Sequence, residues 1–196
     1  MKKSLIPNII TLFRIILTPL FLYFLLVDQP YYMLLALIVF IVASVSDSVD
    51  GYIARKYDFV SEFGKFVDPL ADKILIISTF IALMFLDIIP LWMVSIIIFR
   101  DIAVTVIRMI MIKQGDSVVT SNIAKSKTAF QIVFIYIVIS FKMILQLPFM
   151  KFMHPVIIYL ENGSFYWILM LITTIFTLYT GVLYLLDNKV ILKKNK

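Results

Sequence analysis

Long apolar runs separated by short polar segments make up most of the chain, and this pattern predicts helices that cross a membrane. An α-helix needs about 20 residues to span the ~30 Å hydrocarbon core of a bilayer. Six runs have about this length, at residues 8–27, 31–53, 66–86, 90–112, 128–147 and 165–186. No repeat or low-complexity tract interrupts them. The sequence therefore predicts an all-α bundle of six transmembrane helices, forming a single domain over residues 1–196.

Lysine and arginine concentrate in alternate connecting segments, which predicts the orientation of the chain. The basic segments follow the second, fourth and last runs and contain Arg55, Lys56, Lys65, Lys113, Lys125, Lys127, Lys189, Lys193, Lys194 and Lys196. The opposite connections are nearly free of basic residues, so both termini are expected in the cytoplasm. Short turns make the first two helices, and the third and fourth, antiparallel neighbours. Residues 148–163 can lie along the outer interface or extend a neighbouring helix.

Composition supports a membrane protein and restricts its chemistry. The hydrophobic content of 62% exceeds the roughly 45–50% that is usual in soluble domains. The net charge of +6 reflects topology in such a chain, and no nucleic-acid partner is expected. Because there is no cysteine, metal ligands must be oxygen or nitrogen. One histidine, His154, makes no zinc site alone and is interpreted as an interfacial residue.

Four aspartates interrupt the apolar pattern where the second run ends and the third begins. A carboxylate at membrane depth costs at least ~2.5 kcal/mol, and clustered carboxylates repel one another, so they require a cationic partner. Helical spacing places Asp47 and Asp50 on one face and Asp68 and Asp72 on another. Carboxylate oxygens suit Mg²⁺ or Mn²⁺, and two such ions can assist a phosphoryl displacement. We therefore expect two divalent metal ions here.

Other interpretations of the acidic region remain open from the residues alone. The small residues Gly51, Ala54 and Gly64 can mark close helix packing instead of a ligand. The aspartates can form an ion-pair network with the bases Arg55, Lys65 and Lys73, or can serve a cation or proton transporter. Transporters tend to show internal repeats and broken helices at the bilayer midplane. Neither feature is visible in this sequence.

A second polar set follows along the chain and contains Arg100, Asp101, Thr105, Arg108, Lys125 and Lys127. Arg100 and Arg108 differ by only ~80° around a helix, so both can face the same pocket. Its four cations suit a phosphate monoester. Alternatively, the lysines anchor the chain at the cytoplasmic interface. Arg100 can also be neutralised by Asp101 or by the acidic set.

The acidic motif resembles that of a known family. It reads Asp47-x-x-Asp50-Gly51-x-x-Ala54-Arg55, eight residues, then Gly64-x-x-x-Asp68-x-x-x-Asp72. This pattern is similar to the CDP-alcohol phosphatidyltransferases. The resemblance implies a six-helix enzyme of the cell membrane, commonly a homodimer, with its active site facing the cytoplasm. Such enzymes transfer a phosphatidyl group from CDP-diacylglycerol to an alcohol and release CMP.

Further segments resemble one branch of the family, the bacterial phosphatidylglycerophosphate synthases. They are Pro7-Asn8-x-x-Thr11-x-x-Arg14, residues 66–73, residues 100–108, and Ala124-Lys125-x-Lys127-Thr128 with Gln131. The synthases usually have Glu where this chain has Asp101 and Gly where it has Ala124. An Arg-Asp pair is also familiar from cardiolipin synthases, whereas the second arginine favours a small phosphorylated acceptor. Glycerol 3-phosphate is the expected acceptor, with phosphatidylglycerol or inositol phosphate as alternatives.

The resemblance also implies a role for each site residue. Asp47, Asp50, Asp68 and Asp72 would hold the two metals, and Asp72 would also accept the proton of the attacking hydroxyl. Contacts to CDP-diacylglycerol would come from Asn8, Thr11, Gly51, Arg55 and Ser61. The phosphate of the acceptor would be held by Arg100, Arg108, Lys125 and Lys127. Membrane lipids would surround the apolar helices.

Overall fold

The computed structural model describes the backbone of residues 5–29, 31–57, 62–113 and 122–188, and the side chains of 13–29, 31–46, 73–111 and 126–188. These residues form helices and no strand, which confirms the all-α prediction. The helices are α1 (Leu5–Leu26), α2 (Tyr32–Tyr57), α3 (Glu62–Phe85), α4 (Leu91–Lys113), α5 (Asn122–Gln146), the 3₁₀-helix η1 (Pro148–Met153), α6 (His154–Asn162) and α7 (Phe165–Asp187).

The six long helices coincide with the six apolar runs, because an apolar segment in which every backbone group must be satisfied folds as a helix. Within the described residues, two stretches are long and apolar enough to cross a membrane: Ser126–Gln146 and Phe165–Asp187, each with a mean hydropathy of 2.0. The full count of six spans and the cytoplasmic termini stay predictions. Helices α2 and α3 extend beyond their apolar runs, since the polar motif residues continue the helix.

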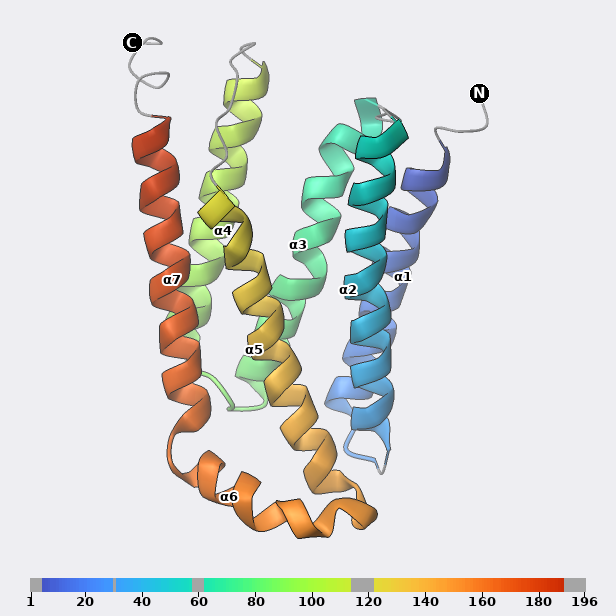
Figure 1. Ribbon diagram of the computed structural model, residues 1–196, viewed down its shortest axis with the longest axis vertical. Helices are drawn as coiled ribbons and strands as arrows, with labels where there is room; N and C mark the ends of the chain where they lie inside the picture. The colour runs from blue at the N-terminus through green and yellow to red at the C-terminus, as the bar shows by residue number, and fades with distance from the viewer. Residues whose placement is uncertain (1–4, 30, 58–61, 114–121, 189–196) are drawn as a thin grey trace.

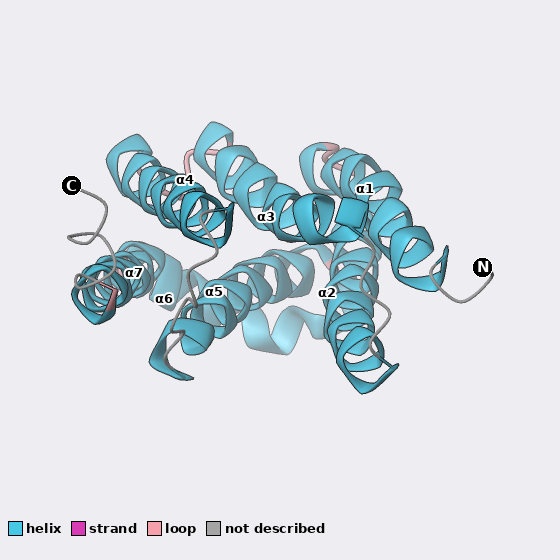
Figure 2. Ribbon diagram, turned by 90° about the horizontal axis from the view of Figure 1, so that it is seen from above, coloured by secondary structure: helices cyan, strands magenta, loops and turns pink. Residues whose placement is uncertain are grey.

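Two layers of three helices make up the bundle when it is viewed along its length (Figure 2). One layer holds α1, α3 and α4, and the other holds α2, α5 and α7. Neighbours contact one another within each layer, and the layers meet through the pairs α1 and α2, α3 and α5, and α4 and α7. The two predicted antiparallel pairs, α1 with α2 and α3 with α4, are confirmed. Helix α7 therefore lies against α4, although the two are distant in sequence.

Aromatic side chains join the layers in the core. The rings of Phe21 in α1 and Phe40 in α2 lie 5.5 Å apart, and those of Phe80 in α3 and Phe134 in α5 lie 5.8 Å apart. All four are at most 1% exposed. Large apolar side chains also cover the outside of the bundle, which suits a chain surrounded by lipid because soluble proteins rarely expose wide apolar patches.

Residues 148–163 neither extend α5 nor continue into α7. Helices η1 and α6 instead run across the end of the bundle that is opposite the two termini (Figure 1). Leu147 and Ile157 are buried and anchor this segment to the bundle. His154 has Nε2 3.0 Å from the carbonyl oxygen of Ile144, a contact that joins the start of α6 to the end of α5. The histidine thus has a structural contact of its own.

Candidate functional site

The acidic motif is divided between the last turns of α2 and the first turns of α3, as the spacing predicts. Both lie at the end of the bundle near the two termini (Figure 1). Asp47, Asp50, Gly51 and Arg55 are in α2, Asp68 and Asp72 are in α3, and Asn8 and Thr11 are in the first turns of α1. The side chains of these residues lie outside the described set, and Ser61 lies outside the described residues altogether. Their proposed contacts stay predictions.

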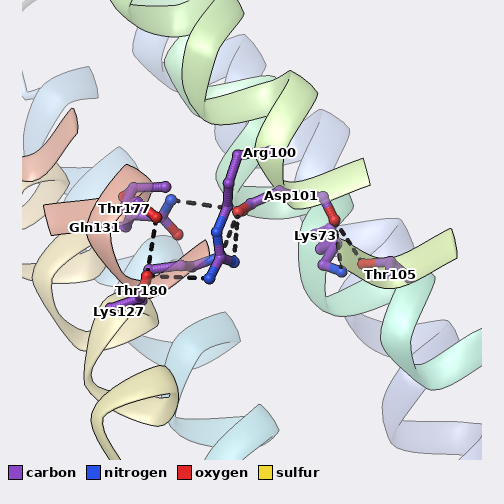
Figure 3. Close-up of polar contacts among 8 residues, drawn as sticks. All are labelled: Lys73, Arg100, Asp101, Thr105, Lys127, Gln131, Thr177 and Thr180. Carbon is purple, nitrogen blue, oxygen red and sulfur yellow. Dashed lines mark hydrogen bonds and ion pairs between the residues drawn. The ribbon is translucent and has the colours of Figure 1, made fainter. Parts of the chain in front are cut away.

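A buried carboxylate, Asp101 of α4, organises the second polar set (Figure 3). Its Oδ1 accepts hydrogen bonds from Lys127 Nζ at 2.6 Å and from Arg100 Nη1 at 3.3 Å, and Gln131 Nε2 lies 3.5 Å from its Oδ2. The side chains of Asp101, Lys127 and Arg100 are 3%, 7% and 10% exposed. A charge this deeply buried is stable only when it is paired. The carboxylate therefore fixes the position of both cations.

The backbone carbonyl of Asp101 is also used. Thr105 Oγ1, one turn later in α4, donates to it at 2.6 Å, and Lys73 Nζ from α3 donates at 3.3 Å. Helices α3, α4 and α5 thus meet at one residue. We call Lys73, Arg100, Asp101, Thr105, Lys127 and Gln131 the Asp101 cluster.

Helix α7 contributes the other contacts of the two α4 arginines. Arg100 Nη2 donates to Thr180 Oγ1 at 3.0 Å. The guanidinium carbon of Arg108 lies 5.6 Å from the centre of the Tyr184 ring, within the range of a cation–π interaction. The predicted grouping is therefore only partly present: the structure places Arg100 and Lys127 on one carboxylate, while Arg108 rests on Tyr184. The side chain of Lys125 lies outside the described set.

The interpretation that Asp101 neutralises Arg100 is confirmed, yet among the described side chains of this cluster positive charge exceeds negative charge. Two buried cations share one carboxylate, and Arg108 adds a third positive charge on the same helix. The Nε–H groups of Arg100 and Arg108 are buried and donate to no acceptor within the described part of the chain. Buried donors without partners are costly. An anionic ligand would supply both acceptors and charge.

Sequence reasoning missed the contribution of α7. Thr177, Thr180, Gly181 and Tyr184 are buried and follow the spacing i, i+3, i+4 and i+7, which is one face of a helix. The sequence signal that could have revealed this face is the helical spacing of small and hydroxyl-bearing residues within an apolar run. This signal identifies a polar face of α7, but it does not identify Arg100 and Arg108 as the residues that contact it.

Comparison with known proteins identifies the class. A sequence model of the CDP-alcohol phosphatidyltransferase family matches residues 4–179. The chain belongs to this family, and it is an enzyme rather than a transporter.

Three individual relatives show which members of the family the chain is similar to. The chain is 42% identical over 156 residues to the CDP-diacylglycerol–glycerol-3-phosphate 3-phosphatidyltransferase of Bacillus subtilis, covering 74% of this chain and 79% of the relative. It is 39% identical over 113 residues to a probable phosphatidylglycerophosphate synthase of Mycobacterium tuberculosis, covering 56% of this chain and 54% of the relative. Over 98 residues it is 38% identical to a probable cardiolipin synthase (CMP-forming) of Drosophila melanogaster, covering 50% of this chain and 30% of the relative.

Proposed function

We propose that the protein transfers the phosphatidyl group of CDP-diacylglycerol to glycerol 3-phosphate, giving phosphatidylglycerophosphate and CMP. The acceptor hydroxyl oxygen forms a bond to the phosphorus that bears diacylglycerol, and the bond from that phosphorus to CMP breaks. The hydroxyl proton passes to Asp72. The similarity to the Bacillus subtilis relative, which bears the name of this activity, supports the proposal.

The donor site would be built from the acidic motif. Asp47, Asp50, Asp68 and Asp72 offer carboxylate oxygens at one end of the bundle, a donor set that suits two Mg²⁺ or Mn²⁺ ions. Bound there, these ions would neutralise the pyrophosphate and stabilise CMP as it leaves. We propose that Asn8, Thr11, Gly51, Arg55 and Ser61 contact the CDP part of the donor.

The acceptor site is supported by one observation above all: Arg100 and Lys127 are buried and share a single carboxylate. A phosphate monoester carries close to two negative charges at neutral pH and offers several acceptor oxygens, so it compensates the excess positive charge. Arg108 and Lys125 would complete the set of cations.

Phosphatidylglycerol is the second candidate acceptor, as in a cardiolipin synthase. It is favoured by the Drosophila relative and by Asp101 after Arg100. Its phosphodiester carries one negative charge, which fits the excess over Asp101 less well than a monoester does.

Release of CMP from CDP-diacylglycerol in mixed micelles, measured separately with glycerol 3-phosphate, phosphatidylglycerol and inositol phosphate, tests the proposal. We expect glycerol 3-phosphate to support CMP release at a lower concentration than the other two acceptors. Asp47→Asn serves as the inactive control. Turnover with phosphatidylglycerol alone would replace the proposal with the second candidate.

We further propose that the chain has six spans, with both termini and the active site on the cytoplasmic side of the cell membrane, and that it forms a homodimer. The absence of cysteine makes single-cysteine labelling direct. In intact cells an impermeant thiol reagent should label Lys151→Cys but not Lys3→Cys. Labelling of Lys3→Cys before permeabilisation would contradict this topology. Light scattering of the detergent-solubilised enzyme measures its oligomeric state.

A further inference from the structure

We propose that one face of α7, formed by Thr180, Gly181 and Tyr184, is a wall of the acceptor site that positions Arg100 and Arg108 for the acceptor phosphate. The inference rests on the proposed function, since it assigns these arginines to that phosphate. The three residues are positioning residues and need not touch the substrate themselves.

Thr180 acts on Arg100 through a hydroxyl whose direction is fixed. Its Oγ1 donates to the carbonyl oxygen of Thr177 at 2.9 Å, so its proton is already used within α7. The lone pairs that remain face α4, and Arg100 Nη2 donates to this oxygen at 3.0 Å (Figure 3). With Asp101 on Nη1 at 3.3 Å, the guanidinium is held from two helices at once. Its Nε is buried and has no hydrogen-bond partner among the described residues.

Gly181 provides the space in which Arg100 lies. A Cβ atom at this position would lie 2.9 Å from Nε and 3.0 Å from Cγ of Arg100. These atoms are in the middle of a side chain whose far end is tethered, so the arginine cannot move aside cheaply. Any larger residue at position 181 must therefore displace the guanidinium.

Tyr184 holds the second arginine one turn further along α7. Its ring is 2% exposed and lies 5.6 Å from the guanidinium carbon of Arg108. Helices α4 and α7 run in the same direction (Figure 1). Arg100, the earlier arginine in α4, therefore contacts Thr180, and Arg108 contacts Tyr184, which is later in α7. The Cα atoms of the two arginines are separated by about 12 Å along α4, whereas Thr180 and Tyr184 are separated by about 6 Å along α7. The contacts with α7 therefore hold both guanidinium groups on the same side of α4, as a shared anion requires.

The test uses single substitutions in α7 of the whole chain, with KM measured for each substrate. Gly181→Ala and Thr180→Val should raise KM for glycerol 3-phosphate by about ten- to hundredfold, because a misplaced charged hydrogen-bond donor loses binding of that order. KM for CDP-diacylglycerol should change little. Thr180→Ser, which keeps the hydroxyl, should restore most of the lost acceptor binding. Tyr184→Leu should raise acceptor KM by about two- to thirtyfold.

Two matched variants control for packing. Gly163→Ala introduces a Cβ that meets only carbonyl oxygens, at 3.4 and 3.5 Å. Thr173→Val removes a buried α7 hydroxyl that donates to the carbonyl of Leu169 in its own helix. Both should leave the two KM values unchanged.

The outcomes separate this inference from the proposed function. If the wild type does not use glycerol 3-phosphate, both are refuted. If the wild type uses it and Gly181→Ala and Thr180→Val keep the wild-type acceptor KM, only the role of α7 is refuted. Equal increases in KM for donor and acceptor, or no recovery in Thr180→Ser, would also refute it, since either result indicates a general loss of structure.

Discussion

Replacement of Asp101 by asparagine should be among the most damaging conservative changes in the bundle. The substitution keeps the shape of the side chain but removes a negative charge that accepts hydrogen bonds from Lys127 at 2.6 Å and Arg100 at 3.3 Å. Both cations are mostly buried, with side chains 7% and 10% exposed, so water screens little of the loss. Within the described part of the chain, Arg100 and Lys127 then have no carboxylate partner.

The size of the effect follows from these contacts. Each hydrogen bond to a charged group contributes about 1.5–3 kcal/mol, and loss of one partner of a buried ion pair costs about 3–5 kcal/mol. The two estimates agree, and we expect Asp101→Asn to lower the free energy of unfolding by about 3–5 kcal/mol. This is a large share of the ~5–15 kcal/mol that is typical of folded proteins.

Thermal unfolding of the detergent-solubilised protein, followed by circular dichroism, measures this loss. A change of 1 kcal/mol shifts Tm by about 2–4 °C at this chain length, so Asp101→Asn should lower Tm by about 6–20 °C. Asp87→Asn is the matched control. Asp87 is exposed in the turn after α3 with φ of 56°, which asparagine tolerates, so its change should stay within about 0.5 kcal/mol.

A double variant that removes Lys127 together with the Asp101 carboxylate tests whether the loss of stability comes from uncompensated charge. The double variant Asp101→Asn/Lys127→Met should recover part of the lost Tm, because it removes one of the uncompensated charges. A Tm for Asp101→Asn equal to that of Asp87→Asn, or a double variant less stable than either single one, would refute the assignment of Asp101 as the shared counter-ion.

Three further predictions concern catalysis. Chelation of divalent ions should abolish CMP release and added Mg²⁺ or Mn²⁺ should restore it, whereas full turnover after exhaustive chelation would exclude metal dependence. Asp72→Asn should abolish transfer but keep much of the affinity for CDP-diacylglycerol. Asp47→Asn and Asp50→Asn should lose donor binding as well. Near-normal turnover of Asp72→Asn would rule out the role of Asp72 as base. Arg108→Lys should raise KM for glycerol 3-phosphate roughly ten- to hundredfold with little change for the donor, because an ammonium lacks the bidentate fork; an unchanged acceptor KM would remove Arg108 from the site.

The long helices could be predicted because one physical demand dominates them. A backbone in lipid must satisfy its own hydrogen bonds, so each apolar run of sufficient length becomes a helix. Residues 148–163 were less predictable. Their apolar side chains fit an interfacial segment or a helix extension equally well, and Pro148 and Pro155 limit a regular helix without fixing its direction. Burial of Leu147 and Ile157 against the bundle sets the course of residues 148–163. This burial depends on the other helices and is not visible in the segment itself.

The candidate acceptor site was predicted in part. The sequence placed Arg100, Arg108, Lys125 and Lys127 in one phosphate pocket and offered Asp101 as one possible counter-ion of Arg100. It did not indicate that Lys127 pairs with the same carboxylate. The angle of only ~80° between Arg100 and Arg108 around the helix suggested that both face the same pocket. Eight residues of helix also separate their Cα atoms by about 12 Å along the axis, which the angle does not reveal. In the structure Arg108 rests on the Tyr184 ring and not on Asp101.

The contribution of α7 shows why a second helix is needed to interpret a buried cation. Threonine and glycine barely disturb an apolar run, so Thr180 and Gly181 look like packing residues until Arg100 is found against them. The effect of these residues on the acceptor would pass through the arginines, because a change at Thr180, Gly181 or Tyr184 moves Arg100 or Arg108 and leaves the acidic motif unaltered.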